Sequence, residues 1–119
     1  MKHELKDDSQ IIATAILRAS DLMGITLKDL AAVLLVSQNE LSQLLKTGIE
    51  PDSETGKRSI SFINVYKRLA SLCGNDEKFM AHYLGTMNKY FKAYPIDVMK
   101  TQPGLEEVHH YLIAMGSKH

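Results

Sequence analysis

The sequence contains no tryptophan, a single cysteine and only three prolines. One cysteine cannot form an intramolecular disulfide, so packing and hydrogen bonds must hold the fold together. No run of about 18 consecutive apolar residues, the length that a membrane-spanning helix needs, is present. The first ten residues, MKHELKDDSQ, mix both charges without an apolar stretch, so we expect no secretory signal and a cytoplasmic location.

An excess of basic residues is also missing, because the formal net charge at pH 7 is zero. Residues 1–50 contain five Lys and Arg against seven Asp and Glu, while residues 51–119 contain nine against seven. Proteins that bind DNA mainly through its phosphates display a basic surface, since counterion release supplies much of the affinity. Any DNA binding should therefore be weak for each subunit.

The alternation of polar and apolar residues that marks strands is absent as well. Apolar residues instead recur every three or four positions, which predicts an all-α fold, a compact bundle of about seven helices. Caps and helix breakers set the expected limits. The helices are expected from Ser9 to Met23, from Thr26 toward Val36, from Ser37 to Gly48, from Ser59 or Ser61 to Gly74, from Asn75 to about Gly85, from Pro95 to Lys100 and from Pro103 to Gly116.

The clearest boundary is IEPDSETGKRS, residues 49–59, whose proline, glycine and polar residues predict a loop with a mobile tip. We therefore divide the chain into residues 1–58 and residues 59–119. The helix that follows the loop is apolar on most sides, which places it at the centre, packed by both parts. All eight aromatic residues lie after residue 61, so the two parts have different cores.

Residues 26–48 have the pattern helix, tight turn, helix, which is typical of DNA-binding proteins. Ser37 can cap the second helix, and Glu40 can complete a capping box. Amide side chains suit contacts to adenine, while a lysine and a helix N-terminus attract phosphate. The residues expected to face DNA are Ser37, Gln38, Asn39, Ser42, Gln43 and Lys46. The alternative is that the two helices serve only packing or dimerisation.

A second candidate surface is the segment that precedes the short helix at Pro95. It places three aromatic residues among polar ones in a stretch without clear helical periodicity, and rings in such loops often contact a partner. The alternative is that these rings fold back onto the core of the domain. The residues expected to bind a protein are Asn88, Lys89, Tyr90, Phe91, Lys92, Tyr94 and Pro95, together with the last helix.

Residue types that could support catalysis or metal binding are present but poorly arranged. His109 and His110 point about 100° apart on a helix and cannot easily share an ion. Cys73 and His82 have no Asn or Asp partner that would orient a base. We therefore expect no enzyme activity, no metal site and no cofactor.

The segment TLKDLAAVLLVSQNELSQLLKTG resembles the Xre-type helix-turn-helix. The resemblance rests on Ala31, on the pair Val36-Ser37 and on Leu41 followed by Ser42. Leu35 stands where that family usually has the glycine of the turn.

Residues 79–116 are similar to the C-terminal domain of the Xre/MbcA/ParS antitoxin family. The elements shared with that family are Tyr83-Leu84, Thr86-Met87-Asn88, Pro95, Val98-Met99-Lys100-Thr101, Gly104 and Val108. The sequence departs from the family at Tyr83, where tryptophan is usual, at Met87, in place of a proline, and at Lys92-Ala93, in place of a double glycine.

The resemblance covers about residues 10–116 and implies an antitoxin. Residues 1–58 would then be an Xre-like helix-turn-helix region that represses the operon. Residues 59–119 would be a toxin-binding domain, sharing the central helix, that neutralises a cognate toxin, commonly of the RES type that consumes NAD. Homodimers are usual in such proteins. The alternative function is a protein-binding adaptor or dimerisation module whose helix-turn-helix no longer reads DNA.

Overall fold

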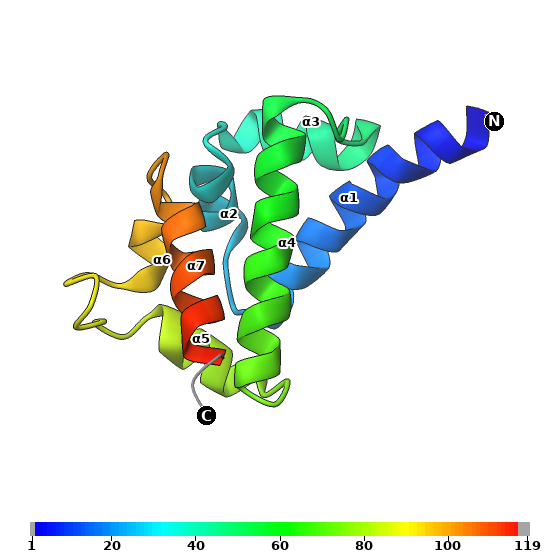
Figure 1. Ribbon diagram of the computed structural model, residues 1–119. Helices are drawn as coiled ribbons and strands as arrows, with labels where there is room; N and C mark the ends of the chain where they lie inside the picture. The colour runs from blue at the N-terminus through cyan, green and yellow to red at the C-terminus, as the bar shows by residue number, and fades with distance from the viewer. Residues whose placement is uncertain (1, 117–119) are drawn as a thin grey trace.

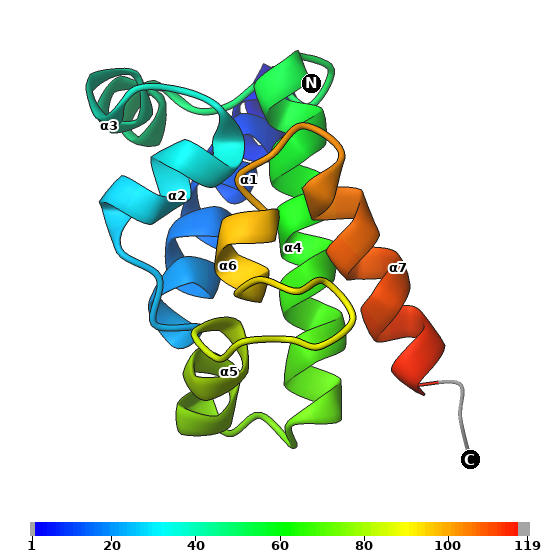
Figure 2. The ribbon, with the colours of Figure 1, turned by 90° about the vertical axis from the view of Figure 1, so that its left-hand side faces the viewer.

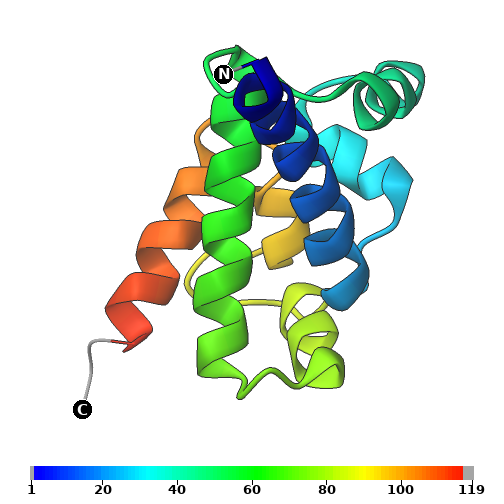
Figure 3. The same cartoon turned by 90° about the vertical axis from the view of Figure 1, so that its right-hand side faces the viewer.

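The fold is arranged around a central helix, α4 (Glu54–Leu72), in a computed structural model that describes residues 2–116 of the chain, with side chains from Asp8 onward. Helix α1 (Lys2–Leu22) packs on one side of α4 and α7 (Gly104–Gly116) on the other, as Figure 3 shows. Within the described residues there are seven helices and no strand, so the predicted all-α fold is confirmed. No helix among them is long and apolar enough to cross a membrane.

Three short helices lie beside α4 on the face seen in Figure 2, and a fourth lies across one end of the molecule. They are α2 (Leu27–Leu34), α5 (Glu77–Leu84), α6 (Pro95–Val98) and, at the end, α3 (Gln38–Thr47). Figures 1 and 2 place α3 near the start of α4, whereas α5 lies at the opposite end. The two halves of the sequence therefore lie side by side along one helix.

A single hydrophobic core joins the two halves. Phe62, Val65 and Leu69 of α4 are almost completely buried and belong to the same cluster as Ile16 of α1 and Leu112 of α7. The expectation that the helix after residue 59 is central, packed by both halves, is confirmed. The predicted division at residue 58 falls within α4, so the boundary between the two parts does not coincide with a gap in the packing.

The helix caps follow the sequence closely in the first half. The Thr26 hydroxyl accepts a hydrogen bond from the Asp29 N–H at 3.1 Å, and the Ser37 hydroxyl accepts one from the Glu40 N–H at 3.0 Å. These bonds satisfy N–H groups that have no partner in the first turn of a helix. The predicted starts of α2 and α3 are therefore confirmed.

The prediction of a loop over residues 49–59 is wrong from Glu54 onward. Helix α4 begins there because the Ser53 hydroxyl accepts a hydrogen bond from the Gly56 N–H at 2.9 Å. Gly56 is buried against the carbonyl of Glu50, a position that leaves no room for a Cβ atom. The glycine thus permits a close approach of backbone to backbone and does not interrupt the helix.

The limits of four other helices also differ from the prediction. Helix α1 begins at Lys2 and not at Ser9, and α6 ends at Val98 and not at Lys100. Helix α5 is capped by Asp76, because Asn75 adopts a left-handed conformation with φ 63°. Helix α7 begins at Gly104, one residue later than expected.

Candidate DNA-binding and protein-binding surfaces

Helices α2 and α3 and the short turn between them form one unit, which we call the α2–turn–α3 unit. Its turn depends on Leu35, which adopts a left-handed conformation with φ 62°. The Leu35 N–H donates to the carbonyl of Ala32, and the Val36 N–H donates to the carbonyl of Ala31. A leucine therefore occupies a backbone conformation that glycine adopts at lower cost.

The structure brings the six residues predicted to face DNA together on the outer surface of α3 and its cap. All six are exposed, whereas Leu41 of the same helix is buried beneath them. The backbone of this helix is tied to α1, because the Gln10 side chain donates to the Lys46 carbonyl at 3.4 Å. The surface thus offers amide, hydroxyl and ammonium groups on a supported helix.

The second surface is the loop between α5 and α6, which Figure 2 shows running across toward α7. Its shape is set by Asn88. The side-chain oxygen of Asn88 accepts hydrogen bonds from the N–H groups of Tyr90, at 2.8 Å, and Phe91, at 3.2 Å. Its N–H donates to the Ala93 carbonyl at 2.9 Å, and its carbonyl accepts from the Lys92 N–H at 2.7 Å. Four hydrogen bonds therefore converge on one residue and fix the loop.

The aromatic residues of this loop form a cluster with α7. The ring of Tyr90 stacks on that of Tyr111 with centroids 4.9 Å apart, and the ring of Phe91 meets both at about 5 Å. Phe91 is packed against the core, but Tyr90 is 71% exposed. Phe91 therefore folds back onto the domain, as the alternative predicted, whereas Tyr90 is exposed at the surface.

The other residues predicted to bind a partner have different positions. Lys89, Lys92 and Tyr94 are exposed, as a contact surface requires. Pro95 is buried as the first residue of α6, and Asn88 is half-buried. The structure therefore gives these last two residues a role in building the loop.

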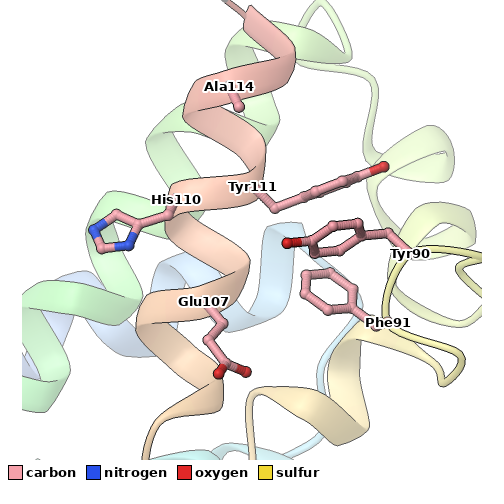
Figure 4. Close-up of a pocket in the computed structure, with 6 residues that line it drawn as sticks. All are labelled: Tyr90, Phe91, Glu107, His110, Tyr111 and Ala114. Carbon is pink, nitrogen blue, oxygen red and sulfur yellow. The ribbon is translucent and has the colours of Figure 1, made fainter.

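A hollow of about 730 Å³ lies between this loop and α7, as Figure 4 shows. Tyr90 and Phe91 of the loop form one side of it, and residues of α7, including Tyr111, form the other. The residues that line it are Tyr90, Phe91, Glu107, His110, Tyr111 and Ala114. The predicted partner loop and the last helix thus meet in one concave surface.

Tyr83 supports the loop from α5. Its hydroxyl accepts a hydrogen bond from the Asn88 side-chain amide at 3.4 Å. Burial, reinforced by nearby Tyr111, raises the pKa of Tyr83 to about 12. The neutral phenol is therefore the form that the fold favours.

Two contacts that the sequence did not predict join the α2–turn–α3 unit to the C-terminal part. The guanidinium of Arg58 in α4 donates to the Val33 carbonyl of α2 and also to the carbonyls of Met99, Thr101 and Gln102, which lie between α6 and α7. Lys100 forms an ion pair with Asp29 of α2 at 2.9 Å, and this hydrogen-bonded contact raises the pKa of Lys100. Both basic residues are thus structural links.

Among the described side chains, residues 8–116, the histidines and Cys73 are not gathered into a reactive site. Glu106 lies 3.8 Å from Nδ1 of His109. Within the same residues, no three side chains of His, Cys, Asp or Glu lie close enough to hold a metal ion. Cys73 is half-buried at the end of α4, and burial raises the pKa of its thiol, which disfavours the nucleophilic thiolate.

These features define a small all-α protein whose C-terminal part presents a cluster of aromatic rings beside a hollow. Residues 68–118 match the family described as the antitoxin Xre/MbcA/ParS C-terminal toxin-binding domain. The resemblance of the C-terminal part to this family is thereby confirmed, and the match supports an antitoxin role with a toxin as partner. The match includes the end of α4, all of α5 and α6, and the α5–α6 loop. No curated protein matches the chain.

Proposed function

We propose that this protein is an antitoxin that neutralises a cognate toxin of the RES type and represses the operon that encodes both. The observation that carries the proposal is the match of residues 68–118 to a toxin-binding domain. The toxin would bind the α5–α6 loop and α7, where exposed Tyr90 stands beside the hollow. Exposed tyrosines on rigid supports are frequent hot spots of protein interfaces, because little conformational entropy is lost on binding.

Replacing Tyr90 and Lys92 together by alanine tests the toxin-binding surface. We expect neutralisation of the co-expressed toxin, encoded by the neighbouring reading frame, to be abolished, because both side chains are exposed on the loop. The matched control replaces Phe79 and Lys78, which are also an exposed ring and an exposed lysine of the same domain but lie on α5. Circular dichroism melting verifies that both double variants fold. Unchanged neutralisation by the Tyr90 and Lys92 variant would refute this surface.

We propose further that the α2–turn–α3 unit is a helix-turn-helix that binds operator DNA as part of a homodimer. The exposed amides of Gln38 and Asn39 near the N-terminus of α3 support this role, since the first turns of a recognition helix contact the bases. The balanced charge of the chain makes the contribution of one subunit small, and a two-fold dimer that reads two half-sites compensates for it.

A mobility-shift assay on the protein's own promoter, run at low salt, tests the DNA role. We expect a shift with the unaltered protein and none with a variant that carries alanine at both Gln38 and Asn39. Light scattering on the same samples gives the oligomeric state. Absence of any shift by the dimer would support the alternative, an adaptor whose α2–turn–α3 unit serves packing or dimerisation, which the acidic balance of residues 1–50 favours.

A further inference from the structure

The hollow between the α5–α6 loop and α7 combines ring faces with one carboxylate. Figure 4 shows the hydroxyl end of Tyr90 directed toward α7, with Glu107 and His110 on the helix side. Ala114, a small residue, lines it as well and leaves space on the helix. A volume of about 730 Å³ is ample for one long side chain of a partner.

The walls of this hollow are held in place before any partner binds. Tyr90 is fixed by its stacking on Tyr111 and by the hydrogen bond from its N–H to the Asn88 side chain. The backbone of Glu107 is held in the first turn of α7, where its N–H donates to the Pro103 carbonyl at 3.2 Å. A partner that enters the hollow would therefore meet rings that are already in place, which reduces the entropy lost on binding.

The charge of the hollow comes from Glu107. Its neighbour Glu106 is already engaged, because it accepts a hydrogen bond from the Ser61 hydroxyl and lies beside His109. For the Glu107 carboxylate, in contrast, no cationic partner is found among the side chains of residues 8–116. The loop lysines, Lys89 and Lys92, do not line the hollow.

We infer that this hollow binds an arginine side chain of the toxin, with the guanidinium against the exposed ring of Tyr90 and paired with the Glu107 carboxylate. The inference rests on the proposed toxin-binding function. A guanidinium is planar and stacks on aromatic faces, and its donors match a carboxylate in a bidentate geometry. A lysine ammonium matches the carboxylate less well and is more strongly hydrated.

Other occupants fit this surface less well. An acidic side chain would be repelled by Glu107, and an apolar one would remove water from the carboxylate without replacing its hydrogen bonds. The combination of an exposed aromatic ring and a carboxylate without a cationic partner among the described residues therefore selects a planar cation.

The probe for this test is N-acetyl-arginine amide, titrated into the isotopically labelled full-length protein and followed by NMR. Its neutral counterpart, N-acetyl-citrulline amide, has nearly the same shape, and ionic strength is kept equal. We expect the initial chemical-shift slopes at Tyr90, Glu107 and Tyr111 to be about three times larger for the arginine probe, since the cation adds charge pairing and ring attraction. Equal slopes for the two probes, or no response to either, would overturn the inference.

A matched pair of variants tests whether the larger chemical-shift slopes of the arginine probe depend on the Glu107 carboxylate. Glu107→Gln should reduce the response to arginine to that of citrulline, whereas Glu77→Gln should leave the response unchanged. Glu77 occupies the first turn of α5 as Glu107 occupies that of α7, so both variants lose the same favourable interaction with a helix N-terminus. A preserved response in Glu107→Gln would assign the binding elsewhere and overturn the inference.

The same variants separate this inference from the proposed function. If an arginine of the toxin enters the hollow, Glu107→Gln should weaken the affinity for the toxin by about 10- to 100-fold, while Glu77→Gln should not. Full affinity in Glu107→Gln, together with loss of neutralisation in the Tyr90 and Lys92 double variant, would overturn the arginine site but leave the toxin-binding surface intact. Full neutralisation by both would refute the proposed surface itself.

Discussion

Asn88 shows how one side chain can replace regular secondary structure. Its amide and backbone groups hold the loop between α5 and α6 through bonds to Tyr90, Phe91, Lys92 and Ala93. Without these bonds, several N–H groups of a partly buried loop would lack partners, which costs free energy. The rings at the tip of the loop therefore keep their orientation although no helix or sheet carries them.

Lys92 adopts a left-handed conformation, with φ 58°, where the related family usually has glycine. We expect Lys92→Gly to raise the free energy of unfolding by roughly 0.5–1 kcal/mol. Relief of about 1–2 kcal/mol of left-handed strain exceeds the added entropy of the unfolded chain. Ala93→Gly, at a residue without positive φ, is the control and should lower stability. Urea denaturation measures both, and a less stable Lys92→Gly protein would contradict the strain at this residue.

The sequence predicted this loop but not the separate roles of its residues. It grouped Asn88 and Pro95 with the exposed contact residues because they border the aromatic segment that leads into the short helix. Their burial follows from hydrogen bonds and packing that only the folded chain reveals. Periodicity could not identify them, since a loop has no repeating face.

Tyr83 predicts a specific loss of stability at high pH. Because its pKa in the fold is raised to about 12, the folded protein holds a proton that the unfolded chain releases near pH 10. Its contribution is therefore complete below about pH 10 and is lost as the pH rises toward 12. Partial exposure limits the effect to the order of 1 kcal/mol. Tyr83→Phe should lose less stability than the unaltered protein between pH 10 and 12, as measured by denaturation, and an identical loss would contradict this assignment.

At the scale of elements, α4 illustrates what local patterns could and could not predict. Its apolar positions identified it as the central helix. Its N-cap, Ser53, was not recognised, because it lies in a segment rich in proline, glycine and polar residues. The first turns of α4 are stabilised by contacts far away in the sequence, above all those of Arg58. Such contacts are invisible to any window of neighbouring residues, and this is why the loop prediction extended too far.

Arg58 holds three elements together, so its replacement should be costly. We expect Arg58→Met to lower the free energy of unfolding by about 2–4 kcal/mol, because the carbonyls of Val33, Met99 and Thr101 lose a charged donor. Arg58→Lys should retain only part of the stability that Arg58 provides, since an ammonium cannot reach all the carbonyls that the planar guanidinium spans. Chemical denaturation measures both variants. A change below about 0.5 kcal/mol in Arg58→Met would show that water replaces these bonds without loss.

At the scale of the whole molecule, the two candidate surfaces lie apart. Helix α3 occupies one end, and the aromatic loop extends from α5 near the other end toward α7 (Figure 2). A toxin bound to the loop would therefore leave the exposed face of α3 free. The sequence predicted both surfaces from their residue types, but their relative position depends on how the two halves pack against α4.

The even balance of charge gives a prediction for the proposed DNA binding by a homodimer. Lys46 is the only cation of α3, so Lys46→Ala should weaken binding equally for specific and nonspecific DNA. The slope of log affinity against log salt should fall by about 0.9 for each lysine lost, and thus by about twice that for a dimer. Lys67→Ala, on the exposed side of α4, is the control and should leave the slope unchanged. An unchanged slope in Lys46→Ala would exclude a phosphate contact at this residue.

The shared core around Phe62, Val65 and Leu69 has a consequence for how the protein is removed from the cell. A domain with one continuous core unfolds cooperatively, so a protease that acts on the open state acts on both halves together. Degradation would then end the proposed toxin neutralisation and the proposed operon repression at the same moment, and no partly digested form would retain either one alone. The lifetime of the intact protein would therefore limit the two proposed activities equally.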